Sequence, residues 1–172
     1  HFTARLGYNR MGRKVKPGLY SLGNPGRDSP VLVTANYTLS FDALRSSLKG
    51  IDCLVLVLDT FGVNVWCAAG KGTFGTRELL DRISAVKLDE VVFRPRLILP
   101  QLCASGVSAP EVRRATGFRV IWGPVRAADL PAFLARGMVK DEAMRTVEFR
   151  FRDRMAVAPV EVTRALPMAA GI

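Results

Sequence analysis

The chain has 172 residues, of which 49% are hydrophobic and 23% are charged, and its formal net charge at pH 7 is +10. These values are typical of a single globular domain and argue against a disordered chain. The longest apolar run, residues 53–58, is far shorter than the ~20 residues that a membrane-spanning helix needs, so no bilayer span is expected within this chain. No secretion signal opens the sequence either.

Short and almost wholly apolar runs predict β-strands. They lie at residues 31–34, 51–58, 91–93 together with 97–99, and 118–122. Apolar residues with helical spacing lie between these runs, at residues 41–48, 79–83, 112–115 and 130–134. This alternation predicts an α/β fold, Rossmann-like, with a mostly parallel sheet and helices on both faces.

The predicted fold also indicates where a ligand binds, because ligands of such sheets lie outside the carboxyl ends of the strands. The loops that follow the predicted strands are residues 36–38, 59–76, 100–107 and 123–125. We therefore expect a ligand cleft bordered by these loops.

The ends of the chain predict its domain organisation. Residues 1–28 are rich in turn-forming residues and are expected to be a lead-in that packs on this rim. Residues 29–155 are expected to form the α/β domain, and residues 156–172 a tail that leads toward a missing segment. Because the chain begins with His1 and stops abruptly at Ile172, we expect it to be a piece of a longer protein.

The positive charge is spread along the chain, with local groups at residues 10–16, 113–114 and 145–154. In the last group Val147, Phe149 and Phe151 alternate with charged residues, which predicts a strand with one solvated face. Solvated faces, an acidic protein partner or an anionic membrane surface account for this charge better than nucleic acid does. We expect no nucleic-acid partner.

Residues 62–76, GVNVWCAAGKGTFGT, contain the spacing of a dinucleotide-binding motif at Gly70, Gly72 and Gly75. In that motif the first glycine directly follows a strand and the third opens a helix. Here the predicted strand ends near Leu58, well before Gly70. Dinucleotide binding therefore stays a minor alternative.

The same stretch also predicts a short cap helix over the ligand cleft. Asn64 is a favourable N-cap, residues 65–69 can form the helix, and Gly70 can end it in the left-handed conformation. Cys67 then lies in the first turn, where the positive end of the helix dipole favours a thiolate. The alternative, in which Cys67 is a small buried residue and Trp66 an ordinary core aromatic, stays open.

The cysteines bear on metal binding. Cys53, Cys67 and Cys103 are widely spaced and include no C-x-x-C pair, and the chain has one histidine, so a four-ligand zinc or iron–sulfur site within it is not expected. A metal held by Cys67 has to bring its own equatorial ligands, as cobalt does in a corrin ring. The small residues Ala68 and Ala69 leave room for a flat macrocycle.

With the stretch 64–71, NVWCAAGK, the chain resembles the cap-helix signature of the HgcA family, the corrinoid protein of microbial mercury methylation. The resemblance extends over most of the chain, through residues 5–7, 17–20, 33–37, 39–42, 99–102 and 123–125. More distantly, the domain is similar to the corrinoid-binding domain of the corrinoid iron–sulfur protein of acetyl-CoA synthesis.

The resemblance implies a function. The expected activity is a corrinoid-dependent methyltransferase that passes a methyl group from methyl-Co(III) corrinoid to Hg(II). Cys67 is implied to be the catalytic residue and the lower axial ligand of the cobalt in a base-off cobalamin or related corrinoid. The implied partners are a ferredoxin-like iron–sulfur electron donor and a methyl donor of the methyltetrahydrofolate type. The implied location is the cytoplasmic face of the inner membrane, through a segment absent here.

The resemblance and the loop positions together give a set of expected cofactor-binding residues. The cap supplies Asn64, Val65, Trp66, Ala68, Ala69, Gly70, Lys71, Gly72, Thr73 and Phe74. The other loops supply Thr34, Asn36, Thr60, Gln101 and Gly123.

Two departures from the mercury-methylation pattern stand out. Residues 102–106 read LCASG where the family usually reads LGAPG, and Thr38 replaces a lysine. Cys103 is therefore either a packing residue or a second thiol that meets mercury. The main alternative function is a methyl-carrying corrinoid protein of the acetyl-CoA pathway, which needs no cysteine on the cap.

Overall fold

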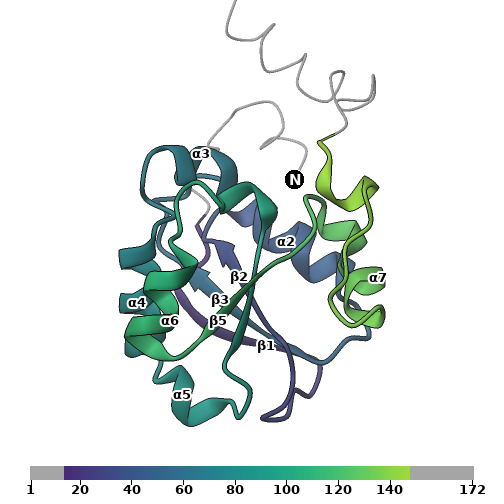
Figure 1. The fold of residues 1–172 in the computed structure, drawn as a ribbon, viewed down its shortest axis with the longest axis horizontal. Helices are drawn as coiled ribbons and strands as arrows, with labels where there is room; N and C mark the ends of the chain where they lie inside the picture. The colour runs from purple at the N-terminus through teal and green to yellow at the C-terminus, as the bar shows by residue number, and fades with distance from the viewer. Residues whose placement is uncertain (1–13, 148–172) are drawn as a thin grey trace, which may run out of the picture. The chain divides into compact units, whose positions relative to one another are not determined.

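Five short strands form one mixed sheet in the computed structural model, which describes residues 14–147 (Figure 1). They are β1 (Gly18–Leu22), β2 (Val31–Ala35), β3 (Cys53–Leu58), β4 (Arg96–Leu99) and β5 (Arg119–Trp122). Their order across the sheet is β1-β3-β2-β4-β5. Strands β2, β3, β4 and β5 run parallel to one another, and β1 pairs antiparallel with β3 at one edge.

Helices cover both faces of this sheet (Figure 1). They are α2 (Thr38–Ser47), α3 (Val65–Gly70), α4 (Thr76–Ala85), α5 (Leu88–Val91), α6 (Ala109–Thr116) and α7 (Leu130–Ala135). Leu79 of α4 and Val112 of α6 pack on one face with Leu56, whereas Leu44 of α2 and Phe133 of α7 pack on the other with Val55. The predicted α/β fold with helices on both faces is confirmed.

The parallel strands are apolar on both faces for a physical reason. Each residue of β3, CLVLVL, is buried, because helices cover successive side chains on opposite faces of the sheet. The strand runs from Cys53 to Leu58 without a charged or strongly polar side chain. Such a run predicts a central strand, and β3 lies between β1 and β2.

One predicted strand is wrong. Residues 91–93 do not form a strand, because α5 runs to Val91 and the chain then passes through an exposed Phe93 before β4 begins at Arg96. Leu88 and Val92, one helical turn apart, are both buried in the core. Their spacing is helical, and Lys87 in the left-handed conformation separates α5 from α4.

The sequence did not predict β1, which lies within the expected lead-in. Its residues are only partly buried or exposed, and Pro17 before it together with Gly18, its first residue, reads as a turn. Pairing with β3 makes it a strand, and that partner lies more than thirty residues away in the register Gly18 with Val57. The strand expected around Phe149 and Phe151, the tail at 156–172 and residues 1–13 of the lead-in lie outside the described residues.

Candidate ligand-binding site

A cavity of about 340 Å³ lies where the strand order changes direction. From β2 the chain moves to β3 on one side, and it later returns to β4 on the other side of β2. Residues of β2 and β4 both line the cavity, together with the start of α3 and the segment that follows β5. This point, at the carboxyl ends of neighbouring parallel strands, is where open α/β sheets bind ligands.

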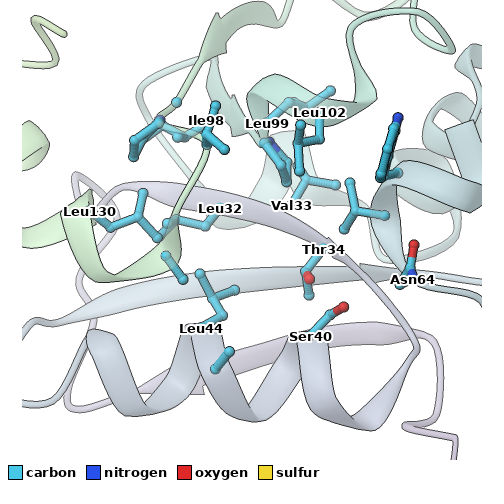
Figure 2. A pocket seen from close by; sticks show the side chains of 18 residues that line it. Leu32, Val33, Thr34, Ser40, Leu44, Asn64, Ile98, Leu99, Leu102 and Leu130 are labelled. Carbon is cyan, nitrogen blue, oxygen red and sulfur yellow. The ribbon is translucent and has the colours of Figure 1, made fainter. Parts of the chain in front are cut away.

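The cavity has an apolar end and a polar end (Figure 2). Leu32, Leu44 and Leu130 gather at one end, whereas the side-chain oxygens of Thr34 and Ser40 lie toward the other. No charged side chain lines it among residues 14–147. The lining residues are Leu32, Val33, Thr34, Ser40, Ala43, Leu44, Asn64, Val65, Trp66, Ile98, Leu99, Pro100, Leu102, Gly123, Pro124, Val125, Ala127 and Leu130.

The predicted cap helix is present as α3, and its first residue borders the cavity. Asn64 is the N-cap as expected, because its side-chain Oδ1 accepts a hydrogen bond from the Cys67 amide at 2.9 Å. The helix ends later than predicted. Gly70 is its last residue, and Gly72, with φ of 76°, takes the left-handed conformation instead.

The cap helix is anchored from below. Ala68 and Phe74 are fully buried, and the amides of Thr73 and Phe74 both donate to the Ala68 carbonyl. A Cβ added to Gly106 would lie 2.3 Å from the Phe74 carbonyl oxygen and 3.2 Å from the Ala69 Cα. The small residues of the cap thus allow close packing against this loop, a use that the sequence analysis did not foresee.

Asn36 organises the loop that leads into the cap. It is 2% exposed, and its Oδ1 accepts hydrogen bonds from the amides of Thr60 at 3.1 Å and Gly62 at 2.9 Å. Its Nδ2 donates to Asp59 at 3.0 Å, and the Thr60 hydroxyl donates to the Val63 carbonyl at 2.7 Å. The side-chain amide of Asn36 and the hydroxyl of Thr60 are therefore engaged within the protein, just before the N-cap of α3.

The three thiols differ in their surroundings. Cys67 is exposed on the cap, whereas Cys53 and Cys103 are buried. The Cys103 thiol donates to the Pro100 carbonyl at 3.1 Å, and burial raises its pKa to about 12. Burial, with the nearby charge of Asp52 adding to it, raises the pKa of Cys53 to about 11. Cys103 is thus placed as a packing residue in its loop.

The residues expected to bind the cofactor fall into two groups. Five of them line the cavity: Thr34, Asn64, Val65, Trp66 and Gly123. The others do not line it: Asn36, Thr60, Cys67, Ala68, Ala69, Gly70, Lys71, Gly72, Thr73, Phe74 and Gln101. In the second group, the glycines connect α3 to α4 rather than following a strand, and Gln101 accepts a hydrogen bond from Lys140.

Sequence reasoning missed part of the lining. Ser40 and Ala43 of α2 and Ala127 and Leu130 near α7 were not predicted to be near a ligand. The small residues Ser40 and Ala43 lie three positions apart, and therefore on one side of α2. That spacing was a signal for a close approach, but only the packing of α2 against β2 tells which side faces the cavity.

The chain matches the family model described as CO dehydrogenase/acetyl-CoA synthase delta subunit over residues 8–134. The chain belongs to this family. Acetyl-CoA decarbonylase/synthase complex subunit gamma of Methanopyrus kandleri is 34% identical over 136 residues, which are 77% of this chain and 29% of that relative. The subunit gamma of Archaeoglobus fulgidus is 32% identical over 125 residues, 72% of this chain and 26% of the relative.

The name of a further relative mentions a corrinoid. The corrinoid/iron-sulfur protein large subunit of Moorella thermoacetica is 31% identical over 122 residues, which are 70% of this chain and 27% of that protein. The chain therefore spans between a quarter and a third of the length of these curated relatives.

These matches overturn the assignment to the HgcA family of mercury methylation. They extend over 122 to 136 residues and name acetyl-CoA complex subunits and a corrinoid/iron-sulfur protein. The prediction that Hg(II) is the methyl acceptor is therefore wrong.

The expected membrane association is also corrected. The matched relatives are named as gamma subunits of the acetyl-CoA decarbonylase/synthase complex. Within residues 14–147, no helix combines the length and the apolar character that crossing a bilayer requires.

Proposed function

We propose that this domain binds a corrinoid and carries a methyl group in a system of the acetyl-CoA decarbonylase/synthase type. This was the main alternative in the sequence analysis, and the family match favours it. The observation that carries the proposal is the cavity at the change of strand order, bordered by the cap helix, in a chain of this family. The activity of the complete protein is part of the same proposal.

The residues around the cavity fit a corrinoid. Residues 14–147 contain no group of three or more His, Cys, Asp or Glu side chains that could hold a metal ion, so a bound metal has to bring most of its ligands. A corrin ring does so, and it combines apolar edges with amide side chains. A cavity with a leucine-lined end and hydroxyls of Thr34 and Ser40 toward the other end suits part of such a molecule.

We assign separate tasks to the residues of the chain. When bound, a corrinoid supplies a cobalt centre that accepts and donates a methyl group, while the protein provides binding, orientation and shielding. Thr34 and Ser40 can donate hydrogen bonds to corrin amides, and Val65 and Trp66 shield the cavity mouth. Asn36 and Asn64 position the cap rather than the ligand, because their side chains hold backbone amides.

Cys67 is the residue that we propose would hold the cobalt of a bound base-off corrinoid. It is the exposed thiol, whereas burial keeps the thiols of Cys53 and Cys103 protonated and enclosed. The sequence analysis counted Cys67 against a carbon-fixation carrier, since such a carrier needs no cap thiol. The family match supports corrinoid binding whether or not Cys67 takes part. Ligation of cobalt by Cys67 is therefore tested separately.

The proposed partners follow from the relatives. One relative is named a corrinoid/iron-sulfur protein, and this name supports an iron–sulfur electron donor as a partner. The expected ferredoxin-like protein is one kind of such a donor. Others are named as subunits of a complex, which supports further subunits as partners. A methyl donor of the methyltetrahydrofolate type completes the proposal.

A titration of the 172-residue chain with cobinamide, a corrinoid that lacks the lower base, tests cofactor binding by absorption spectroscopy. We expect saturable binding by the wild type and at least about tenfold weaker binding by Ala43→Trp, which places a large ring in the cavity. Ala85→Trp, at the exposed end of α4, is the matched control and should bind like the wild type. Equal binding by both variants would contradict the site.

The role of Cys67 requires a second comparison in the same titration. If its thiolate ligates cobalt, Cys67→Ala changes the spectrum of the bound corrinoid while the protein still binds it. Identical spectra for the wild type and Cys67→Ala would remove the ligand assignment and leave corrinoid binding intact.

A further inference from the structure

Four exposed arginines lie at the end of the sheet opposite the cavity. Arg96 and Arg119 are the first residues of β4 and β5, and Arg113 and Arg114 lie in the last turn of α6. We call these four residues the arginine edge. Three of them line a hollow of about 520 Å³, together with Ala109, Pro110 and Val120. The cavity proposed for the corrinoid lies where the same strands end.

The arginine edge is electrostatically unfavourable within the chain itself. Arg96 and Arg119 are directly opposite each other in the register of β4 and β5, and like charges in such a pair destabilise a sheet. None of the four arginines forms an ion pair within residues 14–147, where six acidic side chains pair with other cations: Arg45, Arg77, Arg82, Lys87, Arg94 and Arg136. The charge at this edge is thus unbalanced by the described residues.

Helix stabilisation explains only part of this cluster. Arg113 and Arg114 lie at the carboxyl end of α6, where positive charge interacts favourably with the helix dipole. Arg96 and Arg119 have no such explanation, because each begins a strand and faces a like charge. The pair therefore points to a negatively charged partner outside the described residues.

Strand β5 adds a second feature. It is the last strand of the sheet, and within residues 14–147 it pairs with β4 alone. An edge strand offers main-chain groups to an added strand, which is a common way of binding an extended peptide. The residues that line the hollow include no aromatic side chain on which a nucleic-acid base could stack. These features favour a protein segment over nucleic acid.

We propose that the arginine edge docks an extended, acidic segment of a partner protein. Its carboxylates would pair with the guanidinium groups of Arg113, Arg114 and Arg119, whose planar forks suit bidentate carboxylate contacts. The surface is distinct from the proposed cofactor site and does not depend on it. The residues that line the hollow and those that line the cavity do not overlap.

The test is fluorescence anisotropy with a labelled peptide of about ten residues that alternates Glu and Val, added to the 172-residue chain. We expect Arg113→Glu/Arg119→Glu to bind the peptide at least about tenfold more weakly than the wild type, and added salt to weaken wild-type binding. Arg45→Glu/Arg77→Glu is the matched control: it changes the net charge equally at exposed helix positions and should lose less than about threefold. Circular dichroism verifies that both variants are folded.

Four results would overturn the proposal. Equal losses in the two double variants would show attraction by net charge alone, and absence of peptide binding by the folded wild type would remove the site. Tighter binding of a single-stranded oligonucleotide of equal length than of the peptide would make the edge a phosphate-binding surface. Amide chemical-shift changes on peptide addition should lie at residues 119–122, and changes confined to the cavity would contradict the location.

Discussion

The two ends of the parallel strands differ in how their polar groups are satisfied. At the carboxyl end, buried Asn36 and Thr60 bond to backbone groups, and no charged side chain lines the cavity among residues 14–147. At the amino end, Arg96 and Arg119 face each other in the register without an acidic partner in that part of the chain. One end is completed by the chain itself, and the other carries positive charge that the described residues do not balance.

The largest effect is expected under the cap at the carboxyl end. Phe74→Ala should lower the free energy of unfolding by about 3–5 kcal/mol, because Phe74 is fully buried and its removal leaves a cavity below α3. Phe93→Ala is the matched control, since Phe93 is 65% exposed and its ring face contacts Arg27. Urea unfolding measures both, and similar losses would contradict the difference in packing.

The loop network should give the next largest effect. Asn36→Ala removes the acceptor of two backbone amides, so the unfolding free energy should fall by about 1–3 kcal/mol, and the cap should exchange amide hydrogens faster. Asn24→Ala, at an exposed turn, should change little. Unchanged amide exchange at residues 64–68 in Asn36→Ala would show that the loop does not position α3.

The buried thiols predict a dependence of stability on alkaline pH. The pKa of Cys103, raised to about 12, lies above that of an unfolded cysteine, about 8.5. Between these values the unfolded chain loses the proton and the folded chain keeps it, so stability is complete below about pH 8.5 and declines as pH rises toward about 12. Cys103→Ala should flatten this decline in urea unfolding between about pH 8 and about pH 10.5; an identical slope would contradict it.

The smallest effect is expected at the amino end of the strands, where Arg96 and Arg119 lie opposite each other. Arg119→Glu places an opposite charge across from Arg96 and should raise the unfolding free energy by about 0.2–1 kcal/mol. The same charge change in Arg45→Glu breaks a pair with Asp42 and should not stabilise. A destabilising effect of Arg119→Glu in low-salt urea unfolding would show that repulsion between the two arginines does not weaken the sheet.

The sequence predicted the central part of the fold better than its edges. Runs such as residues 53–58 are apolar on both faces and can only be buried between helix layers, so their assignment needed no tertiary information. By contrast, β1 depends on pairing with β3, and the sequence of residues 91–93 is compatible with either a strand or the end of a helix. Local patterns do not distinguish these cases because long-range packing decides them.

The cap shows the same limit at the candidate site. Asn64 was predicted as the N-cap because its side chain can bond to an amide of the first turn, and that bond is present. The roles of Ala68 and Phe74 depend on contacts with Gly106 and the core, which no local spacing encodes. Likewise, Ser40 and Ala43 reach the cavity only through the placement of α2.

By itself, the sequence determined the α/β architecture and the cap helix with its N-cap, because periodicity and capping act between residues close in the chain. The tertiary structure decided which polar groups are hydrogen-bonded within the chain and where the cavity lies. It also decided that Arg96 and Arg119 lie opposite each other at the other end of the sheet. Those outcomes depend on strand order and register, and residues far apart in the sequence set both.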